Sequence, residues 1–157
     1  MHQNYGYLDP SGNRLNSNTP HESWDAHRHC VICGEKNPLG LGIRFRVVSE
    51  SKVEAHWTVS ERLQGYTGLL QGGVTAALLD SAMVNCLRLH GIEAYTAEMN
   101  VRYLKPIPVG CILHISGHML KSRKQMHWTE ATLYSRESIV ATATGKFITK
   151  EIHKENI

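Results

Sequence analysis

The sequence predicts an α+β fold in which a curved antiparallel β-sheet of about six strands wraps around one long central helix. Residues 72–87, GGVTAALLDSAMVNCL, are long enough for about four helical turns and carry apolar residues on every side. Two segments before this helix and four after it alternate apolar and polar residues, as strands do. Because one helix cannot cover both faces of such a sheet, a sheet curved around the helix is the economical arrangement.

The chain before the helix divides into an arm, a loop and two strands. Residues 1–20 are rich in Asn, Ser, Gly and Pro, which predicts a loose polar arm. Residues 21–42 show little periodicity and predict mostly loop. Two alternating segments then predict strands joined by a tight turn, at residues 43–49 and 53–59. A loop that contains Gly65 and Gly68 leads into the helix.

The chain after the helix is a series of predicted strands. Gly91 is expected to end the helix. Two prolines, Pro106 and Pro108, and a loop at residues 121–125 separate alternating segments at residues 95–104, 111–120, 126–135 and 138–149. We therefore expect one domain over residues 21–150 with a short tail at residues 151–157. The uncovered sheet face, or an edge strand, would invite a second subunit.

Composition and charge narrow the class of protein. The chain has 157 residues, of which 41% are hydrophobic and 20% charged, as is typical of a globular domain with a substantial core. No segment reaches the ~18 uncharged apolar residues of a membrane span, and the polar N-terminus lacks a secretory signal, so we expect a cytoplasmic protein that binds no membrane. A net charge of +3 is too small to indicate nucleic acid, although it suits a small phosphate-bearing ligand.

Asp80 is the only charged residue within residues 72–87. A carboxylate is rarely buried without a partner, because desolvation opposes its charged form. From the residues alone, two explanations stay open. Either Asp80 is a catalytic base whose pKa is raised by partial burial, or it is a structural carboxylate that is satisfied by Ser81, by a threonine or backbone donor, or by a basic residue at an interface.

Gly72 and Gly73 open the predicted helix and present no side chain to an approaching ligand. The first N–H groups of a helix lack internal partners, and the helix dipole is positive at this end. This end of the helix can therefore stabilise a developing oxyanion. The alternative is that the paired glycines only permit close packing or a tight turn.

Three segments carry a resemblance to a known family. They are CVICGEKNPLGLGIRF at residues 30–45, GYTGLLQGGVTAALLDSAM at residues 65–83 and TAEMNVRYLKPIPVG at residues 96–110. In this order and spacing they resemble the hotdog-fold acyl-CoA thioesterases of the phenylacetic-acid-degradation and 4-hydroxybenzoyl-CoA type. The resemblance implies a hotdog fold and hydrolysis of an acyl-CoA thioester without a cofactor. It also implies an active site between two subunits of a homodimer or homotetramer.

The resemblance implies roles for particular residues. Asp80 would act as general base or nucleophile, and the backbone N–H groups of Gly72 and Gly73 would polarise the thioester carbonyl. Thr96 matches a hydroxyl residue that positions water in some relatives, although an ordinary strand threonine is an equal alternative.

The chain departs from the family pattern at two positions. Gln71 stands where members commonly carry His, and Gly65 stands where some carry Asn. Gln71 cannot titrate, so as a site residue it would orient a carbonyl or brace the loop, and Gly65 would lie against the substrate. These departures keep open a second function, an acyl-CoA-binding or regulatory protein without turnover. A third reading is a structural or partner-binding domain whose pocket is filled.

Basic residues offer candidates for binding the phosphates of CoA. Arg102 and Lys105 follow from the strand at residues 95–104, and Arg123 belongs to a predicted turn cluster with Lys121 and Lys124. The alternative is that charge on turns is simply solvated.

His27, His29, Cys30 and Cys33 are residue types that bind zinc. A single Cys-x-x-Cys without a second pair is a weak zinc signal, and no β-α-β pattern surrounds it to suggest redox chemistry. We therefore expect a structural loop that packs on the sheet and holds no metal.

Overall fold

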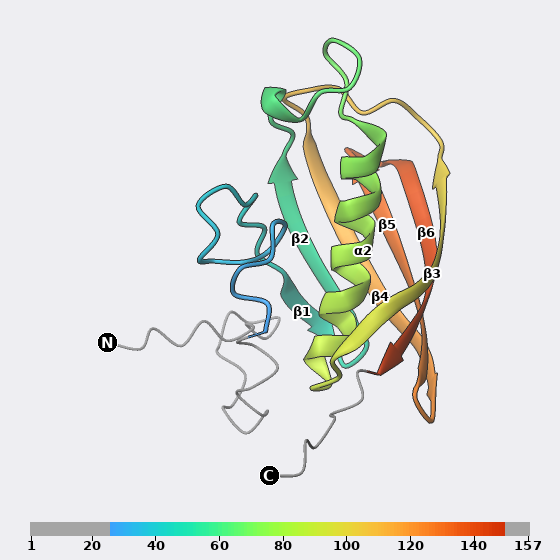
Figure 1. The fold of residues 1–157 in the computed structure, drawn as a ribbon. Coiled ribbons are helices and arrows are strands. Elements are labelled where there is room, and N and C mark those ends of the chain that lie inside the picture. The colour runs from blue at the N-terminus through green and yellow to red at the C-terminus, as the bar shows by residue number, and fades with distance from the viewer. Residues whose placement is uncertain (1–25, 150–157) are drawn as a thin grey trace.

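The described part of the chain, residues 26–149, is a six-stranded antiparallel sheet curved around one helix in this computed structural model (Figure 1). The helix is α2 (Gly72–Leu89), and a short 3-10 turn, η1 (Glu61–Leu63), precedes it. The strands pair in the order β1-β2-β4-β5-β6-β3. Their bounds are β1 (Arg46–Ser49), β2 (Lys52–Thr58), β3 (Ala94–Tyr103), β4 (Ile112–Arg123), β5 (Met126–Ser135) and β6 (Ser138–Thr149).

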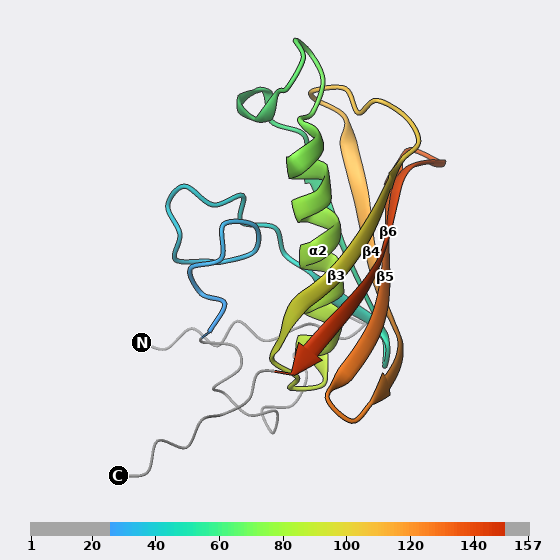
Figure 2. The same cartoon turned by 45° about the vertical axis from the view of Figure 1, so that its right-hand side comes forward.

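This architecture confirms the predicted fold class. Figure 2 shows α2 on one side of the sheet, and no segment of residues 26–149 covers the other side. The predicted arm at residues 1–20 and tail at residues 151–157 lie outside the described residues. Within the described residues, no helix is both long and apolar enough to cross a membrane.

The helix packs its apolar side on the sheet, and its ends follow local signals. Its fully buried side chains include Leu78, Leu79, Ala82, Met83 and Cys86. The helix ends at Leu89, and Gly91 then adopts a φ of 68°, a left-handed conformation that glycine tolerates best.

Two strand boundaries differ from the prediction. The first strand begins at Arg46, because Ile43 bonds through its N–H to the carbonyl oxygen of Ile32 (3.0 Å) and not to a neighbouring strand. The predicted loop at residues 121–125 is wrong. β4 continues to Arg123, and Lys124, with a φ of 55°, makes the tight turn.

The continuation of β4 also changes the predicted basic turn cluster. Lys121 is a strand residue whose Nζ lies 4.4 Å from the centre of the Trp128 ring, in a cation–π contact. Arg123 is the last residue of β4 and not a turn residue. Period-2 alternation is hard to detect in a segment of long polar side chains, which explains why the sequence predicted a loop there.

Gly117 lets the helix lie directly on β4. A Cβ at this position would overlap the carbonyl oxygen of Ala82, a backbone atom of α2. We expect Gly117→Ala to lower the free energy of unfolding by about 3 kcal/mol, the upper end of the usual overpacking cost. Gly145→Ala should cost less, because its nearest atoms belong to the side chains of Met83 and Phe147. Urea titration of both variants tests this ranking, and the reverse order would contradict it.

Candidate active site

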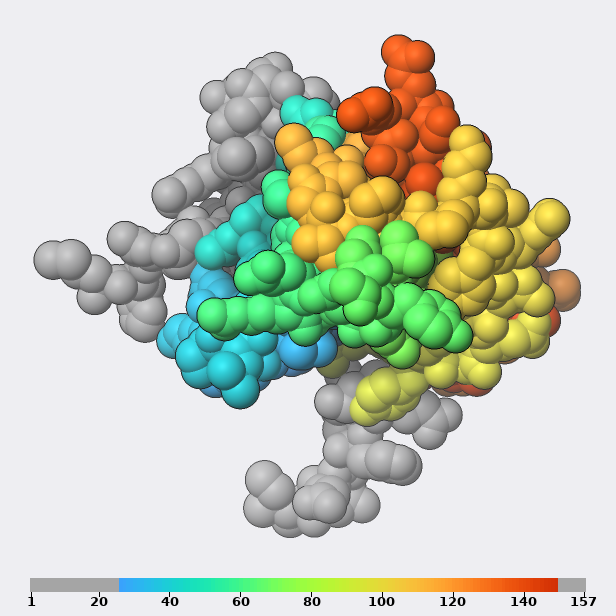
Figure 3. Space-filling model, turned by 90° about the horizontal axis from the view of Figure 1, so that it is seen from above, coloured from blue at the N-terminus to red at the C-terminus, as the bar shows by residue number. Residues whose placement is uncertain are grey.

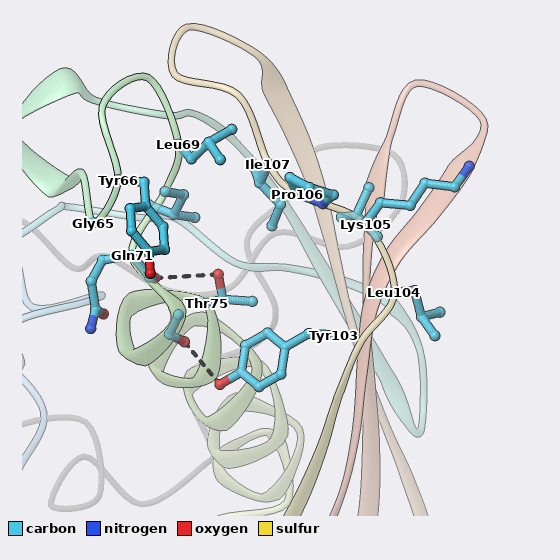
Figure 4. Close-up of a pocket in the computed structure, with 13 residues that line it drawn as sticks. Gly65, Tyr66, Leu69, Gln71, Thr75, Tyr103, Leu104, Lys105, Pro106 and Ile107 are labelled. Atoms are coloured by element: carbon cyan, nitrogen blue, oxygen red, sulfur yellow. Dashed lines mark hydrogen bonds between the residues drawn. The ribbon is translucent and has the colours of Figure 1, made fainter.

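A cavity of about 650 Å³ lies at the N-terminal end of α2 (Figure 4). Its walls come from the loop before the helix, the first turn of the helix and the loop after β3. Figure 3 looks down on this end, where the green loop before α2 adjoins the yellow and orange residues that follow β3. Four predicted site residues line the cavity: Gly65, Gln71, Gly72 and Lys105.

Gln71 caps the helix at this cavity. Its side-chain Oε1 accepts a hydrogen bond from the N–H of Val74 at 3.0 Å. A Cβ on Gly73 would lie 2.9 Å from that oxygen, and a Cβ on Gly65 would lie 3.3 Å from Gln71 Cγ. The two glycines therefore leave the room in which the Gln71 side chain folds back onto the helix.

The cap leaves two donors at the helix start. Within residues 26–149, the N–H groups of Gly72 and Gly73 make no hydrogen bond, whereas Val74 and Thr75 bond to Gln71. Free N–H groups at the positive end of a helix dipole are suited to hold an oxyanion.

Tyr103 braces the same turn, and sequence analysis gave it no role. Its hydroxyl donates a hydrogen bond to the carbonyl oxygen of Gly72 at 3.0 Å, as Figure 4 shows. Tyr103 shares the inward face of β3 with the apolar residues of that strand. Alternation predicts that face, but only the structure shows that the strand delivers the ring to Gly72.

A second group of predicted site residues meets near the middle of the helix. The Thr96 hydroxyl, on β3, donates to Asp80 Oδ1 at 2.7 Å. Asp80 is half-buried, and burial raises the pKa of its carboxyl, while the Thr96 hydrogen bond opposes this rise. Smaller electrostatic effects come from Cys30, which raises this pKa, and from His27, which lowers it. This setting suits a base that stays accessible to water.

The start of α2 and the Asp80–Thr96 pair lie apart within one chain. Asp80 is seven positions beyond Gly73, and at 1.5 Å per helical residue this places them about 10 Å apart along the axis. A single carbonyl carbon therefore cannot be close to the helix start and to Asp80 of the same chain.

The remaining predicted phosphate-binding residues lie away from the cavity. Arg102 precedes Tyr103 on β3, and successive side chains of a strand point to opposite faces, so Arg102 lies on the uncovered face of the sheet. There it lines a hollow with Asn100 and Glu130. Arg123 lies at the end of β4, at the opposite end of the sheet from the cavity (Figure 1). Of the three basic candidates, the structure brings only Lys105 to the cavity.

One group of residues in the described chain has the composition and spacing of a metal site. The ligand atoms of His27, Cys30 and Cys33 all lie within 4.8 Å of one another. The neighbouring His29 is exposed and is not part of this group.

The comparisons with known proteins agree on one family. Residues 67–142 match the thioesterase superfamily. Over 114 residues the chain is 31% identical to acyl-coenzyme A thioesterase 13 of Homo sapiens. The aligned region covers 71% of this chain and 73% of that protein.

Solved structures show the same fold. Thioesterase superfamily member 2 of zebra fish superposes with a TM-score of 0.69 at 16% identity, over 82% of this chain and 97% of that one. The smu.793 protein of Streptococcus mutans, solved with acetyl-CoA bound, gives a TM-score of 0.65 at 21% identity, over 69% and 88% of the two chains. The resemblance in the three sequence segments is thus confirmed, and the chain belongs to the thioesterase superfamily and has its hotdog fold.

Proposed function

We propose that this protein is an acyl-CoA thioesterase in which Asp80 activates the attacking water. The observation that carries the proposal is a half-buried carboxylate with a raised pKa, held by Thr96 on a helix whose first two N–H groups are free. The relative in Homo sapiens is named an acyl-CoA thioesterase, and the Streptococcus mutans structure holds acetyl-CoA, which supports this substrate class.

Each group has a defined task in the reaction. The Asp80 carboxylate accepts a proton from water as the water oxygen attacks the thioester carbonyl carbon. The resulting oxyanion is held by the N–H groups of Gly72 and Gly73. Collapse of this intermediate breaks the C–S bond, and the proton on Asp80 passes to the departing sulfur. The products are a carboxylic acid and CoA. In the alternative route, the Asp80 carboxylate attacks the carbonyl and the C–S bond breaks, so that CoA leaves as a thiolate. Water then cleaves the mixed anhydride to the carboxylic acid and regenerates Asp80, and the proton released protonates the thiolate.

The separation within one chain implies that two chains build each site. We propose a homodimer in which the cavity of one copy faces Asp80 of the other. Among the described residues, β3 is an edge strand bonded only to β6, and its Tyr95 is 63% exposed. Antiparallel pairing of two β3 edges is self-complementary and brings the two helices side by side. The uncovered sheet face would then serve a dimer of dimers.

Lys105 is suited to bind a phosphate of CoA at the mouth of the cavity. It lies in the loop that follows β3, and its side chain extends outward, away from the other residues that line the cavity (Figure 4). Its ammonium group would face the anionic end of the substrate while the thioester lies near Gly72.

Turnover of an acyl-CoA panel tests the proposed function. The purified protein is incubated with short, long and aromatic acyl-CoAs, and released CoA is followed with a thiol-detecting reagent. Binding of each acyl-CoA is measured in parallel by calorimetry. Thiol release that scales with enzyme concentration is the expected result. Tight binding of acyl-CoA without any release would instead establish the second candidate, a binding or regulatory protein.

That second candidate rests on Gln71. Its side chain cannot titrate, and its Oε1 is engaged with Val74, so Gln71 handles no proton beside the two free N–H donors. In the proposed mechanism this proton handling belongs to Asp80 alone.

Thr96 provides a test through pH. The hydrogen bond from Thr96 favours the charged form of Asp80, so Thr96→Val should raise the pKa of Asp80 further. Because the base acts when deprotonated, activity is lost as pH falls through this pKa. The acid limb of the kcat/KM profile should therefore move to higher pH in Thr96→Val and stay in place in Thr96→Ser. An unmoved limb in Thr96→Val would mean that Asp80 is not the titrating group.

A further inference from the structure

The N-terminal loop, residues 26–45, folds into a tight turn that gathers three metal-binding side chains. The N–H of Gly34 donates to the carbonyl oxygen of Cys30 (2.9 Å), and the N–H of Cys30 donates to the carbonyl oxygen of His27 (3.0 Å). A Cβ on Gly34 would overlap the Cys30 backbone and lie 2.6 Å from the carbonyl oxygen of Arg28, so only glycine fits there. The turn therefore directs both Cys side chains and His27 to one point.

The spacing of these side chains matches tetrahedral zinc. Zn–S bonds of about 2.3 Å and Zn–N bonds of about 2.0–2.1 Å at tetrahedral angles place a sulfur and a nitrogen ligand about 3.6 Å apart. Cys33 Sγ lies 3.8 Å from His27 Nδ1, and all three ligand atoms lie within 4.8 Å of one another. The Cys33–His27 distance is thus within a few tenths of an ångström of the tetrahedral value, and the other pairs lie within about 1 Å of it.

Two hydrogen-bond donors, one within the turn and one on α2, are directed at the two sulfurs. The N–H of Ile32 donates to Cys30 Sγ at 3.4 Å, and Asn85 Nδ2 on α2 donates to Cys33 Sγ at 3.6 Å. Asn85 is only 2% exposed, and its Nδ2 also donates to the carbonyl oxygen of Ser81 at 2.8 Å. Hydrogen bonds to sulfur stabilise thiolate ligands and fix their orientation, as the outer shell of a metal site does.

We propose that His27, Cys30 and Cys33 bind one Zn²⁺ ion, which fastens the N-terminal loop to α2 through Asn85. Two thiolates balance the charge of the dication, and a mixed sulfur and imidazole set suits zinc among the divalent metals. With three ligands from residues 26–149, the fourth position is open to water. From the sequence we expected a loop that holds no metal. The spacing of Cys30 and Cys33 alone does not show that His27 lies beside them. The proposal stands independently of the thioesterase reaction.

The zinc site would stabilise a segment that has no regular secondary structure. Residues 26–45 contain no helix or strand, although Ile32 is buried in the core and both cysteines pack against it. A metal that binds the folded loop and not the unfolded one adds its binding free energy to the stability of the fold. We therefore expect chelation to lower the melting temperature and added zinc to restore it.

Metal content and cobalt substitution test the site directly. The full chain is purified under reducing conditions without added metal, and zinc is measured by mass spectrometry. We expect one zinc per chain. After removal of the zinc, Co²⁺ should give the absorption bands of a tetrahedral thiolate site. Purified protein that holds no zinc and whose reduced form gives no such bands with Co²⁺ would overturn the proposal.

Matched variants assign the ligands. His27→Gln and Cys33→Ser should lose stoichiometric zinc and the cobalt bands, whereas His29→Gln and Cys111→Ser should keep both, since His29 and Cys111 lie outside the group. Circular dichroism confirms that each variant is folded. Loss of zinc in His29→Gln with retention in His27→Gln would contradict the assignment, as would a stable disulfide between Cys30 and Cys33 in the protein as isolated.

Discussion

Replacing Asp80 by Asn is expected to lower kcat for acyl-CoA hydrolysis by about 10²–10⁴-fold, the usual contribution of a positioned general base. Asn has nearly the same shape, and its Oδ1 can still accept the hydrogen bond from Thr96. The variant therefore removes the titratable carboxylate and little else. Binding of acyl-CoA should persist, because no substrate contact is assigned to Asp80 beyond the reacting water.

The same substitution should not destabilise the fold. The pKa of Asp80 is raised in the folded state, so its charged form costs stability at every pH above that folded pKa. This cost disappears as pH falls below the unfolded pKa. At neutral pH the neutral Asn avoids it, and Asp80→Asn should be at least as stable as the wild type. Urea titration beside the kinetic assay checks this, and a variant that is folded yet fully active would exclude Asp80 as the base.

The fold was largely predictable because its strongest signals are local. The helix is a long, almost uninterrupted apolar segment, and the strands alternate apolar and polar residues, so both patterns could be recognised without the structure. The prediction was wrong at Lys121 and Arg123, whose long polar side chains extend β4 beyond its apolar part. There the strand is held by hairpin pairing with β5, Lys121 opposite Trp128 and Arg123 opposite Met126, which the alternation of apolar and polar residues does not report.

The candidate site was predictable only in part, for the same reason. The residues alone left Asp80 open between catalysis and structure, and its pairing with Thr96 depends on β3 passing beside α2. The bond from Tyr103 to Gly72 likewise joins segments whose proximity is set by the fold. The approach of His27 to Cys33 depends on a local turn whose geometry the Cys-x-x-Cys spacing does not report. Residue types suggested the chemistry, whereas tertiary structure decided which of them meet.

Gly72→Pro is expected to lower kcat by about 10²–10³-fold, the usual cost of losing one oxyanion donor. Gly72 is the first residue of α2, a position where proline is well tolerated. Gln71, with φ −67° and ψ 137°, already has the extended conformation that a residue before proline prefers. The substitution therefore removes one N–H group and leaves the helix intact.

Gly72→Ala is the matched control for this substitution. Alanine keeps the N–H, and its Cβ would lie 3.6 Å from the Tyr103 ring, an ordinary contact. We expect it to retain most of the wild-type activity. Equal loss in the Ala and Pro variants would show that the space beside Tyr103 matters and that the donor does not.

Mixing the two inactive variants tests whether each site is built from two chains. Asp80→Asn and Gly72→Pro are unfolded together and refolded as an equal mixture. Suppose that each site takes residue 72 from one copy and residue 80 from the other. Half of the chains carry Gly72 and the other half carry Asp80, so about a quarter of all sites combine both intact residues. Activity should then recover to about a quarter of the wild-type value. If both residues acted within one chain, every site would keep one defect and the mixture would stay inactive. The separation of about 10 Å along α2 favours recovery, because one chain cannot bring both groups to the same carbonyl carbon.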